Sequence, residues 1–306
     1  MILCSGEALI DMLPRRTPAG EDAFAPYAGG AVFNTAIALG RLGAPTGFFS
    51  GLSSDLFGQR LTRALADSHV SAEHAVISDR PTTLAFVTLT HGHASYAFYD
   101  EGTAGRMLSP DDLPALPDDI EAMFFGGISL AVEPCATAYH ALMAREAAQR
   151  VTMLDPNIRP GFIRDETAFR ARIDAMIALA DIVKLSDEDL HWLEGDGPLP
   201  ELAQKLLAKG AKVVCITEGS KGATGYTARG PVSVAAKKVE VVDTVGAGDT
   251  FNAGVLAALH RAGALTKERI ATLDDATLHD ALELGVRAAA VTVSRAGANP
   301  PWEREL

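Results

Sequence analysis

Short apolar runs alternate with amphipathic segments along the middle of the chain. Runs of strand length and helical patterns follow one another in the order 151–154, 166–180, 182–185, 187–194, 199–209 and 213–217. Strands joined through helices lie parallel, so this rhythm predicts a mostly parallel α/β sheet flanked by helices on both faces. The sequence shows no repeat, linker or low-complexity tract, and we expect one domain over residues 1–306.

Two segments depart from this rhythm. Residues 83–90 and 94–99 alternate in polarity on either side of a short turn at 91–93, which predicts a β-hairpin. Residues 24–27 are a further candidate strand. We expect these strands to belong to insertions at about 13–30 and 83–106, outside the main sheet. An ordinary edge hairpin is the alternative that the pattern leaves open.

The charge balance limits the possible partners. The formal net charge is −12, whereas nucleic acids and anionic membranes usually require a basic protein face. We therefore expect neither as a partner. A nucleotide is not excluded, because backbone amides, lysines and a divalent ion can bind phosphates inside an acidic protein.

Cysteine usage and the N-terminus indicate a cytoplasmic protein. Cys4, Cys135 and Cys215 are isolated, which argues against a disulfide framework or a zinc knuckle. The first residues resemble a strand without a preceding basic segment, and no apolar run approaches the roughly 18 residues of a membrane span.

The most informative segment is 239–254. Its β-branched run predicts a strand, Gly246, Ala247 and Gly248 predict a turn, and Asp249 opens a helix. Such a turn directs backbone amides at one point, where the helix start adds unpaired amides, so it predicts an anion hole for a phosphoryl group. A carboxylate beside that hole suits a base that accepts the proton of an attacking hydroxyl. The alternative is that Asp249 only caps the helix.

A second glycine-rich junction favours the chemical interpretation. Gly29 and Gly30 precede a helix that carries Asn34 on its first turn. Asp11 follows the first predicted strand, and polar clusters at 155–159, 184–189 and 217–222 follow later ones. Because open α/β sheets bind ligands at the carboxyl ends of their strands, we expect these clusters to meet at one site.

On these residues, the sequence resembles the ribokinase or PfkB-type family of sugar kinases. The two signature segments of the family correspond to 29–43 and 243–254, and the resemblance covers essentially the whole chain. It implies a ribokinase-like three-layer fold with a small β-strand lid over the sugar. It also implies ATP- and Mg²⁺-dependent phosphorylation, with Asp249 as the base and the amides of Gly246, Ala247 and Gly248 as the anion hole.

The resemblance assigns further residues by position. It implies that the sugar contacts Asp11, Gly29, Gly30, Asn34, Phe98, Arg159 and Asp249. It implies that ATP contacts Asn157, Lys184, Ser186, Thr217, Gly219, Gly222, Gly246 and Gly248, with 286–297 beside the adenine. The family's Asn-x-x-Glu segment, which holds water around Mg²⁺, appears here as 186–189, so both Glu188 and Asp189 are candidates. Carbonyls around Asp243 and Val245 are candidates for binding K⁺.

The substrate is predicted from the same resemblance. Ala31 stands where ribokinases typically carry a lysine, which disfavours ribose. Segments 81–87, 98–100 and 103–108 look most like bacterial fructokinases, so we predict conversion of fructose to fructose 6-phosphate. Kinases of 2-keto-3-deoxygluconate share much of the lid pattern, and nucleoside kinases share the core. A non-catalytic sugar or nucleotide sensor is the alternative from another class, although it would not need Asp249.

The lid also bears on assembly. Its strands have edges to protect, and pairing two lids would cover them. We therefore expect a homodimer.

Overall fold

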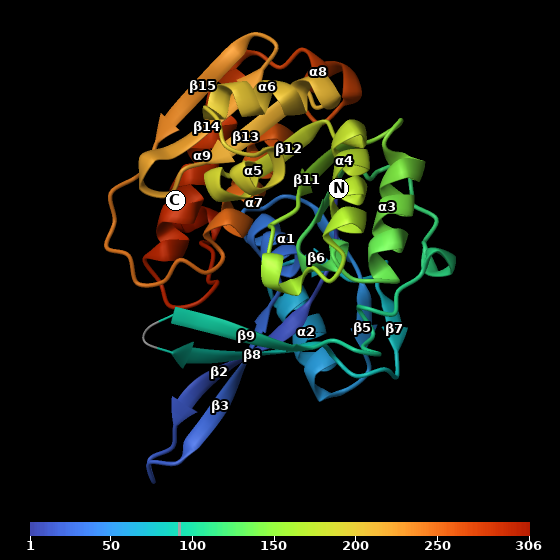
Figure 1. The fold of residues 1–306 in the computed structure, drawn as a ribbon, viewed down its shortest axis with the longest axis vertical. Coiled ribbons are helices and arrows are strands. Elements are labelled where there is room, and N and C mark those ends of the chain that lie inside the picture. Colours follow the sequence, from blue (N-terminus) through green and yellow to red (C-terminus); the bar gives the residue numbers. More distant parts are fainter. Residues whose placement is uncertain (91–92) are drawn as a thin grey trace.

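The computed structural model describes residues 1–90 and 93–306, and a nine-stranded sheet forms the centre of this part of the chain (Figure 1). The strand order is β15 (Gly230–Ala235), β14 (Gly222–Thr227), β13 (Val213–Thr217), β12 (Ile182–Ser186), β11 (Val151–Asp155), β10 (Ala122–Gly126), β1 (Ile2–Ser5), β4 (Thr46–Phe49) and β6 (Val70–Ser71). In this order, the strands from β13 through β12, β11, β10, β1 and β4 to β6 pair in parallel. Strand β14 pairs antiparallel with both of its neighbours, β13 and β15. The predicted mostly parallel sheet is confirmed.

Helices cover both faces of this sheet and create two apolar cores. One core joins the sheet to α1 (Ala31–Arg41), α2 (Leu56–Asp67), α7 (Ala247–Arg261), α8 (Lys267–Ala271) and α9 (Asp275–Val293). The other joins it to α3 (Cys135–Glu146), α4 (Glu166–Leu179), α5 (Asp187–Glu194) and α6 (Leu199–Lys209). The strands read as continuous apolar runs because both of their faces are buried. The predicted three-layer arrangement is confirmed.

A second, four-stranded sheet forms the lid, with the order β3 (Asp22–Gly29), β2 (Leu9–Arg16), β8 (Leu84–Thr90) and β9 (His93–Tyr99). Figure 1 shows β2 and β3 projecting away from the body. The predicted hairpin pairs Thr90 with His93, and its turn at 91–92 lies outside the described residues. The strand limits differ from the prediction, because β2 begins before residue 13 and residues 100–106 contain no strand. A separate pair, β5 (Gly51–Ser53) and β7 (Val76–Ser78), lies beside the body.

The strand register gives the lid two different faces. Asp11 pairs with Tyr27 and Ala85, and Ala85 pairs with Phe98, so these residues share one face. The opposite face carries Phe24, Phe86 and Tyr99. Their rings meet edge to face, with centroid distances of 5.0 Å between Phe24 and Phe86 and 5.4 Å between Phe86 and Tyr99. One lid face therefore carries Asp11 together with Phe98, and the other carries the row of Phe24, Phe86 and Tyr99.

Two sequence expectations about local structure are wrong. Asp11 comes after β1 along the chain as predicted, but it lies within β2 of the lid and not at the carboxyl end of a main-sheet strand. The β-branched run at 239–245 forms no strand, because its backbone bonds to a helix end: the amides of Val242 and Asp243 both donate to the carbonyl of Val293. Val239 and Val241 instead line a cavity beside α9. No helix in the described ranges is long and apolar enough to cross a membrane.

Candidate active site

The second glycine junction starts α7 and orients the Asp249 carboxylate. Gly246 precedes the helix with a left-handed φ of 80° and without a side-chain cap. A Cβ atom there would lie 2.7 Å from the Cβ of Ala298, so the turn requires glycine. Asp249 lies on the first turn, and its Oδ2 accepts a hydrogen bond of 2.9 Å from Nδ2 of Asn34. The alternative in which Asp249 only caps the helix is wrong, since Gly246 holds the cap position.

The first glycine junction meets the second through α1. Gly30 has a φ of 108°, and a Cβ on it would lie 2.9 Å from the carbonyl oxygen of Glu7. Helix α1 then places Thr35 Oγ1 3.2 Å from the carbonyl oxygen of Asp249, beside the contact that Asn34 makes. Gly29 lies against the Asp11 carboxylate, which a Cβ would approach to 2.2 Å. The fold therefore brings the predicted sugar residues of the lid, α1 and α7 close together.

Burial changes the acidity of both predicted sugar-site carboxylates. Burial raises the pKa of Asp249 to about 7; the Asn34 hydrogen bond opposes this rise, and the charge of Asp155 adds to it. Burial also raises the pKa of Asp11 to about 6. A carboxylate with a pKa near neutrality accepts a proton far more readily than an ordinary aspartate. Asp249 therefore has the acidity expected of a general base.

A buried cation lies next to the α7 turn. Lys184 Nζ lies 2.9 Å from the position of a Cβ on Gly248, so the missing side chain lets the ammonium approach the backbone. Asp155, at the end of β11, accepts hydrogen bonds from Lys184 Nζ at 2.9 Å and from Asn252 Nδ2 at 2.7 Å. Burial opposes the charge of Lys184, but Asp155, Asp189 and Asp249 together raise its pKa. The turn thus has both amides and a fixed positive charge.

Sequence reasoning missed Asp155 and Asn252 as site residues. Asp155 stood in a recognised cluster after a strand, but nothing in the sequence indicated which cation it would bind. Asn252 lies three residues after Asp249, and this spacing places both residues on neighbouring positions of one helix face. The three-residue spacing from Asp249 is therefore the sequence signal that could have identified Asn252 as a site residue.

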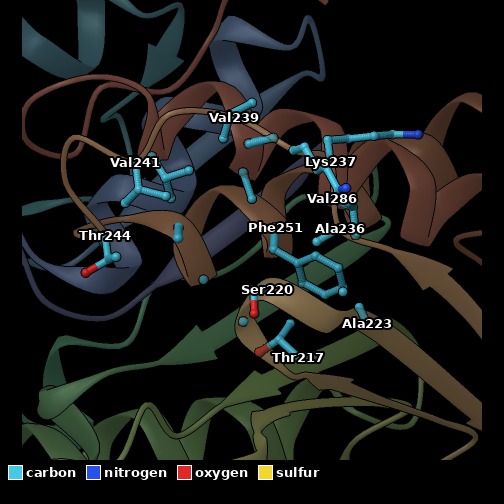
Figure 2. Close-up of a pocket in the computed structure, with 18 residues that line it drawn as sticks. Thr217, Ser220, Ala223, Ala236, Lys237, Val239, Val241, Thr244, Phe251 and Val286 are labelled. Carbon is cyan, nitrogen blue, oxygen red and sulfur yellow. The ribbon is translucent and has the colours of Figure 1, made fainter.

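The described structure has a cavity of about 750 Å³ beyond the α7 turn (Figure 2). Its walls come from the β13–β14 connection, residues 236–244, and helices α7 and α9. The predicted nucleotide residues Thr217, Gly219, Gly222 and Gly248 line it, together with Phe251, Val286 and Val293. Its size lies within the range of small-molecule sites, and its wall is mainly apolar. The other predicted nucleotide residues, Asn157, Lys184, Ser186 and Gly246, are not among its lining residues.

The acidic segment at 186–189 contains both candidates for the water-mediated Mg²⁺ contact, Glu188 and Asp189, and their burial differs. Ser186 caps α5, and its Oγ accepts a hydrogen bond from the amide of Asp189. Asp189 is buried, whereas Glu188 is exposed. Burial and the nearby Asp155 charge raise the pKa of Asp189, while Lys184 and Arg159 oppose the rise. Asp189 is therefore the carboxylate beside the Asp155–Lys184 pair. No group of three or more metal-ligating side chains occurs among the described residues.

The remaining predicted residues lie around this centre. Phe98 meets Phe162 edge to face at 4.6 Å. The amide of Asn157, which has a positive φ of 44°, donates to Asp155 Oδ1. Arg159 is exposed. Asp243 accepts from the amides of Val245 and Gly297, which ties the segment before α7 to the end of the α9 region.

Glu7 is a further buried carboxylate that the sequence did not single out. Its Oε1 accepts from the amide of Ala31 at 2.9 Å, and its Oε2 accepts from the amide of Ser129 at 3.3 Å. Burial raises its pKa, although these hydrogen bonds oppose the shift. Glu7 therefore fixes the start of α1 against the connection after β10. The only sequence signal was its place just after the first strand.

Comparisons with known proteins identify the class. A family model for pfkB family carbohydrate kinases matches residues 1–305, and the chain belongs to this family. The predicted family, ribokinase-like fold and carbohydrate kinase class are confirmed. The chain is 58% identical over 280 residues to a fructokinase from Rhizobium leguminosarum bv. trifolii, covering 92% of this chain and 86% of that protein.

Solved structures agree with this assignment. A fructokinase from Xylella fastidiosa with bound ATP superposes with a TM-score of 0.89 at 30% identity, covering 97% of this chain and 93% of that one. A double mutant of a Vibrio cholerae O395 fructokinase, with fructose, ADP and a potassium ion bound, gives a TM-score of 0.85 at 26% identity. The match covers 97% of this chain and 93% of that one.

Proposed function

We propose that this protein transfers the terminal phosphoryl group of ATP to the 6-hydroxyl of fructose. One observation carries the chemical part: Asp249 is buried on the first turn of α7 with a pKa of about 7, beside a glycine turn and a lysine. The similarity to a Rhizobium fructokinase supports fructose as the sugar. 2-Keto-3-deoxygluconate and nucleosides are the competing substrates, and a non-catalytic sensor is the competing class.

The proposed roles of the residues in sugar binding and phosphoryl transfer are as follows. Asp11, Gly29, Gly30 and Asn34 hold the sugar, with Phe98 and Arg159 at its edges. Asn34 orients the Asp249 carboxylate, and Asp249 accepts the hydroxyl proton as the bond to phosphorus forms. The amides of Gly246, Ala247 and Gly248, with Lys184 beside them, stabilise negative charge on the phosphoryl oxygens. Positioning in a buried site then supplies much of the rate acceleration.

ATP would occupy the cavity of Figure 2, with its base against the apolar wall and its phosphates directed to the α7 turn; the size and lining of the cavity support this placement. Thr217, Gly219 and Gly222 would follow the nucleotide, and Asn157, Lys184 and Ser186 would lie near its phosphates. Mg²⁺, when bound, would offset phosphate charge, and the buried Asp189 fits a water-mediated contact to it better than Glu188. Carbonyls around Asp243 and Val245 are our proposed K⁺ ligands.

A panel of sugars assayed for ADP release tests the proposal. Metal-replete protein should turn over fructose faster than ribose, 2-keto-3-deoxygluconate or nucleosides, and ³¹P NMR should identify the 6-phosphate. Fructose 1-phosphate as product would contradict the predicted position of transfer. Absence of turnover with the whole panel, together with tight sugar binding, would favour the sensor.

We further propose a cytoplasmic homodimer of single-domain chains in which the lid closes over the sugar. The aromatic row of the lid supports pairing, because Phe24 is 44% exposed and Tyr99 is 63% exposed. Closure would exclude water and limit ATP hydrolysis. Hydrogen exchange tests the closure: fructose should protect the amides of residues 84–99, and unchanged exchange with saturating sugar would contradict it.

A further inference from the structure

A second buried ion pair lies where the lid joins the body. Arg106 Nη1 donates to Oδ1 of Asp100 over 2.9 Å, and the two side chains are 15% and 8% exposed. Arg106 Nε also donates to the carbonyl of Glu133 over 3.2 Å. The Asp100 carboxylate is therefore held in one orientation, and its charge is paired.

The other oxygen of Asp100 has no partner. Oδ2 is buried, and no donor from the described residues lies within hydrogen-bond distance. Leaving a buried carboxylate oxygen without a donor costs free energy, so proteins seldom keep one without a purpose. A ligand hydroxyl that reached this oxygen would remove that cost. Asp100 thus has the properties of an acceptor that a ligand completes.

The position of Asp100 connects it to the proposed sugar site. Asp100 follows β9, two residues after Phe98, and lines a small cavity with Glu7, Ala8, Ser129 and Phe162. Phe162 contacts Phe98, and Glu7 holds the amide that starts α1. The cavity therefore lies between the residue that follows β9 and the Glu7–Ala8 backbone, against which Gly30 of the first glycine junction packs.

On the basis of the kinase function proposed above, we propose that Asp100 is a specificity residue that accepts a hydroxyl of a neutral sugar and rejects sugar acids. Fructose carries a hydroxymethyl group at the end remote from C6, whereas 2-keto-3-deoxygluconate carries a carboxylate there. A substrate carboxylate near Asp100 would meet like charge in a buried site. Arg106, the cation that could receive such an acid, is already paired with Asp100.

The isosteric substitution Asp100→Asn tests this assignment. It removes the charged acceptor and leaves Arg106 without its counter-ion. We expect kcat/KM for fructose to fall about tenfold, mainly through KM, since the lost hydrogen bond involves a charged group. We expect kcat/KM for 2-keto-3-deoxygluconate to rise, so that the preference for fructose falls by roughly 100-fold. Calorimetric binding of fructose should weaken in parallel.

Two further variants sharpen the test. Arg106→Gln removes the cation and keeps the Asp100 charge. Binding of fructose should therefore weaken, while 2-keto-3-deoxygluconate should still be rejected. Asp111→Asn changes an exposed carboxylate of the same segment and should alter neither substrate. A folded Asp100→Asn protein with unchanged fructose KM and unchanged preference would overturn the assignment while the kinase function stands. A wild-type protein that neither binds nor phosphorylates any neutral sugar would overturn both.

Discussion

The two sheets of the described structure differ in how completely they bury their side chains. In β10 of the nine-stranded sheet all five residues are buried, because helices cover both faces. In β3 of the lid only Gly29 is buried, and Phe24 stays largely exposed. The body therefore buries its own strands, whereas the lid leaves aromatic side chains exposed. Groups fixed in the body should control chemistry and stability, and those of the lid should control binding and assembly.

The largest effect should follow from changing the proposed base, Asp249, in the body. Asp249→Asn keeps the size and can keep the contact with Asn34, but it cannot accept a proton. We expect kcat to fall by roughly 10² to 10⁴ with little change in ATP affinity. Steady-state kinetics and nucleotide titration measure the two quantities. Near-normal turnover would make Asp249 structural.

Thermal melting of Asp249→Asn supplies a control, because the raised pKa of Asp249 fixes the direction of the expected change in stability. The pKa of Asp249 is about 7 in the folded protein and near 4 when unfolded, so the folded state holds an extra proton between these values. The contribution of this group to stability is therefore greatest below pH 4 and declines as the pH rises to 7. Asparagine does not ionise, so it lacks the free-energy cost of a buried ionised carboxylate. The variant should therefore be no less stable than wild type at pH 8.

The next effect concerns the rigidity of the body. Gly127 has a φ of 75°, and a Cβ there would lie 2.1 Å from Oε1 of the buried Glu7. Gly127→Ala should lower the free energy of unfolding by about 3 kcal/mol, through backbone strain and displacement of Glu7. Gly161→Ala is the matched control, since no heavy atom lies within 4 Å of its Cβ position. Denaturant titrations measure both variants. Equal unfolding midpoints for Gly127→Ala and Gly161→Ala would contradict the tight packing of Gly127 against Glu7.

The raised pKa of Asp249 should make kcat/KM for fructose depend on pH. The carboxylate must be ionised to accept a proton, and burial raises its pKa to about 7. We expect kcat/KM for fructose to fall tenfold per unit below pH 7 and to level off above it. An acidic limb that remains near pH 4 would show that Asp249 titrates as an ordinary aspartate. The Asn variant should lack this limb.

The smallest effect on turnover should come from the aromatic row of the lid. Tyr99→Ser removes an exposed ring that contacts Phe86, and Phe24→Ser removes its counterpart on β3. We expect weaker self-association by sedimentation and a few-fold rise in the KM for fructose, with kcat within about twofold. A monomeric wild-type protein would refute pairing through this face. A large loss of kcat would show that the lid also fixes the chemistry.

The sequence predicted the body well because its signals are local. The helices at 187–194 and 199–209 have the predicted limits, since caps and apolar spacing lie within each segment. The run at 239–245 was misjudged because β propensity cannot reveal that its amides bond to the end of α9. Asp155, Asn252 and Glu7 were missed for a similar reason. Their partners lie far along the chain, and only folding brings them together.

The separation of Asp100 and Phe98 from Asp249 has a consequence for protein engineering. The proposed specificity residues Phe98 and Asp100 lie within one short stretch, 98–106, while the proposed base lies on α7 and the glycine turn precedes that helix. Exchanging that stretch between homologues would alter substrate choice without touching the catalytic helix. The architecture is modular in this sense, and a library confined to these nine positions could search for new sugar preferences on an unchanged reaction centre.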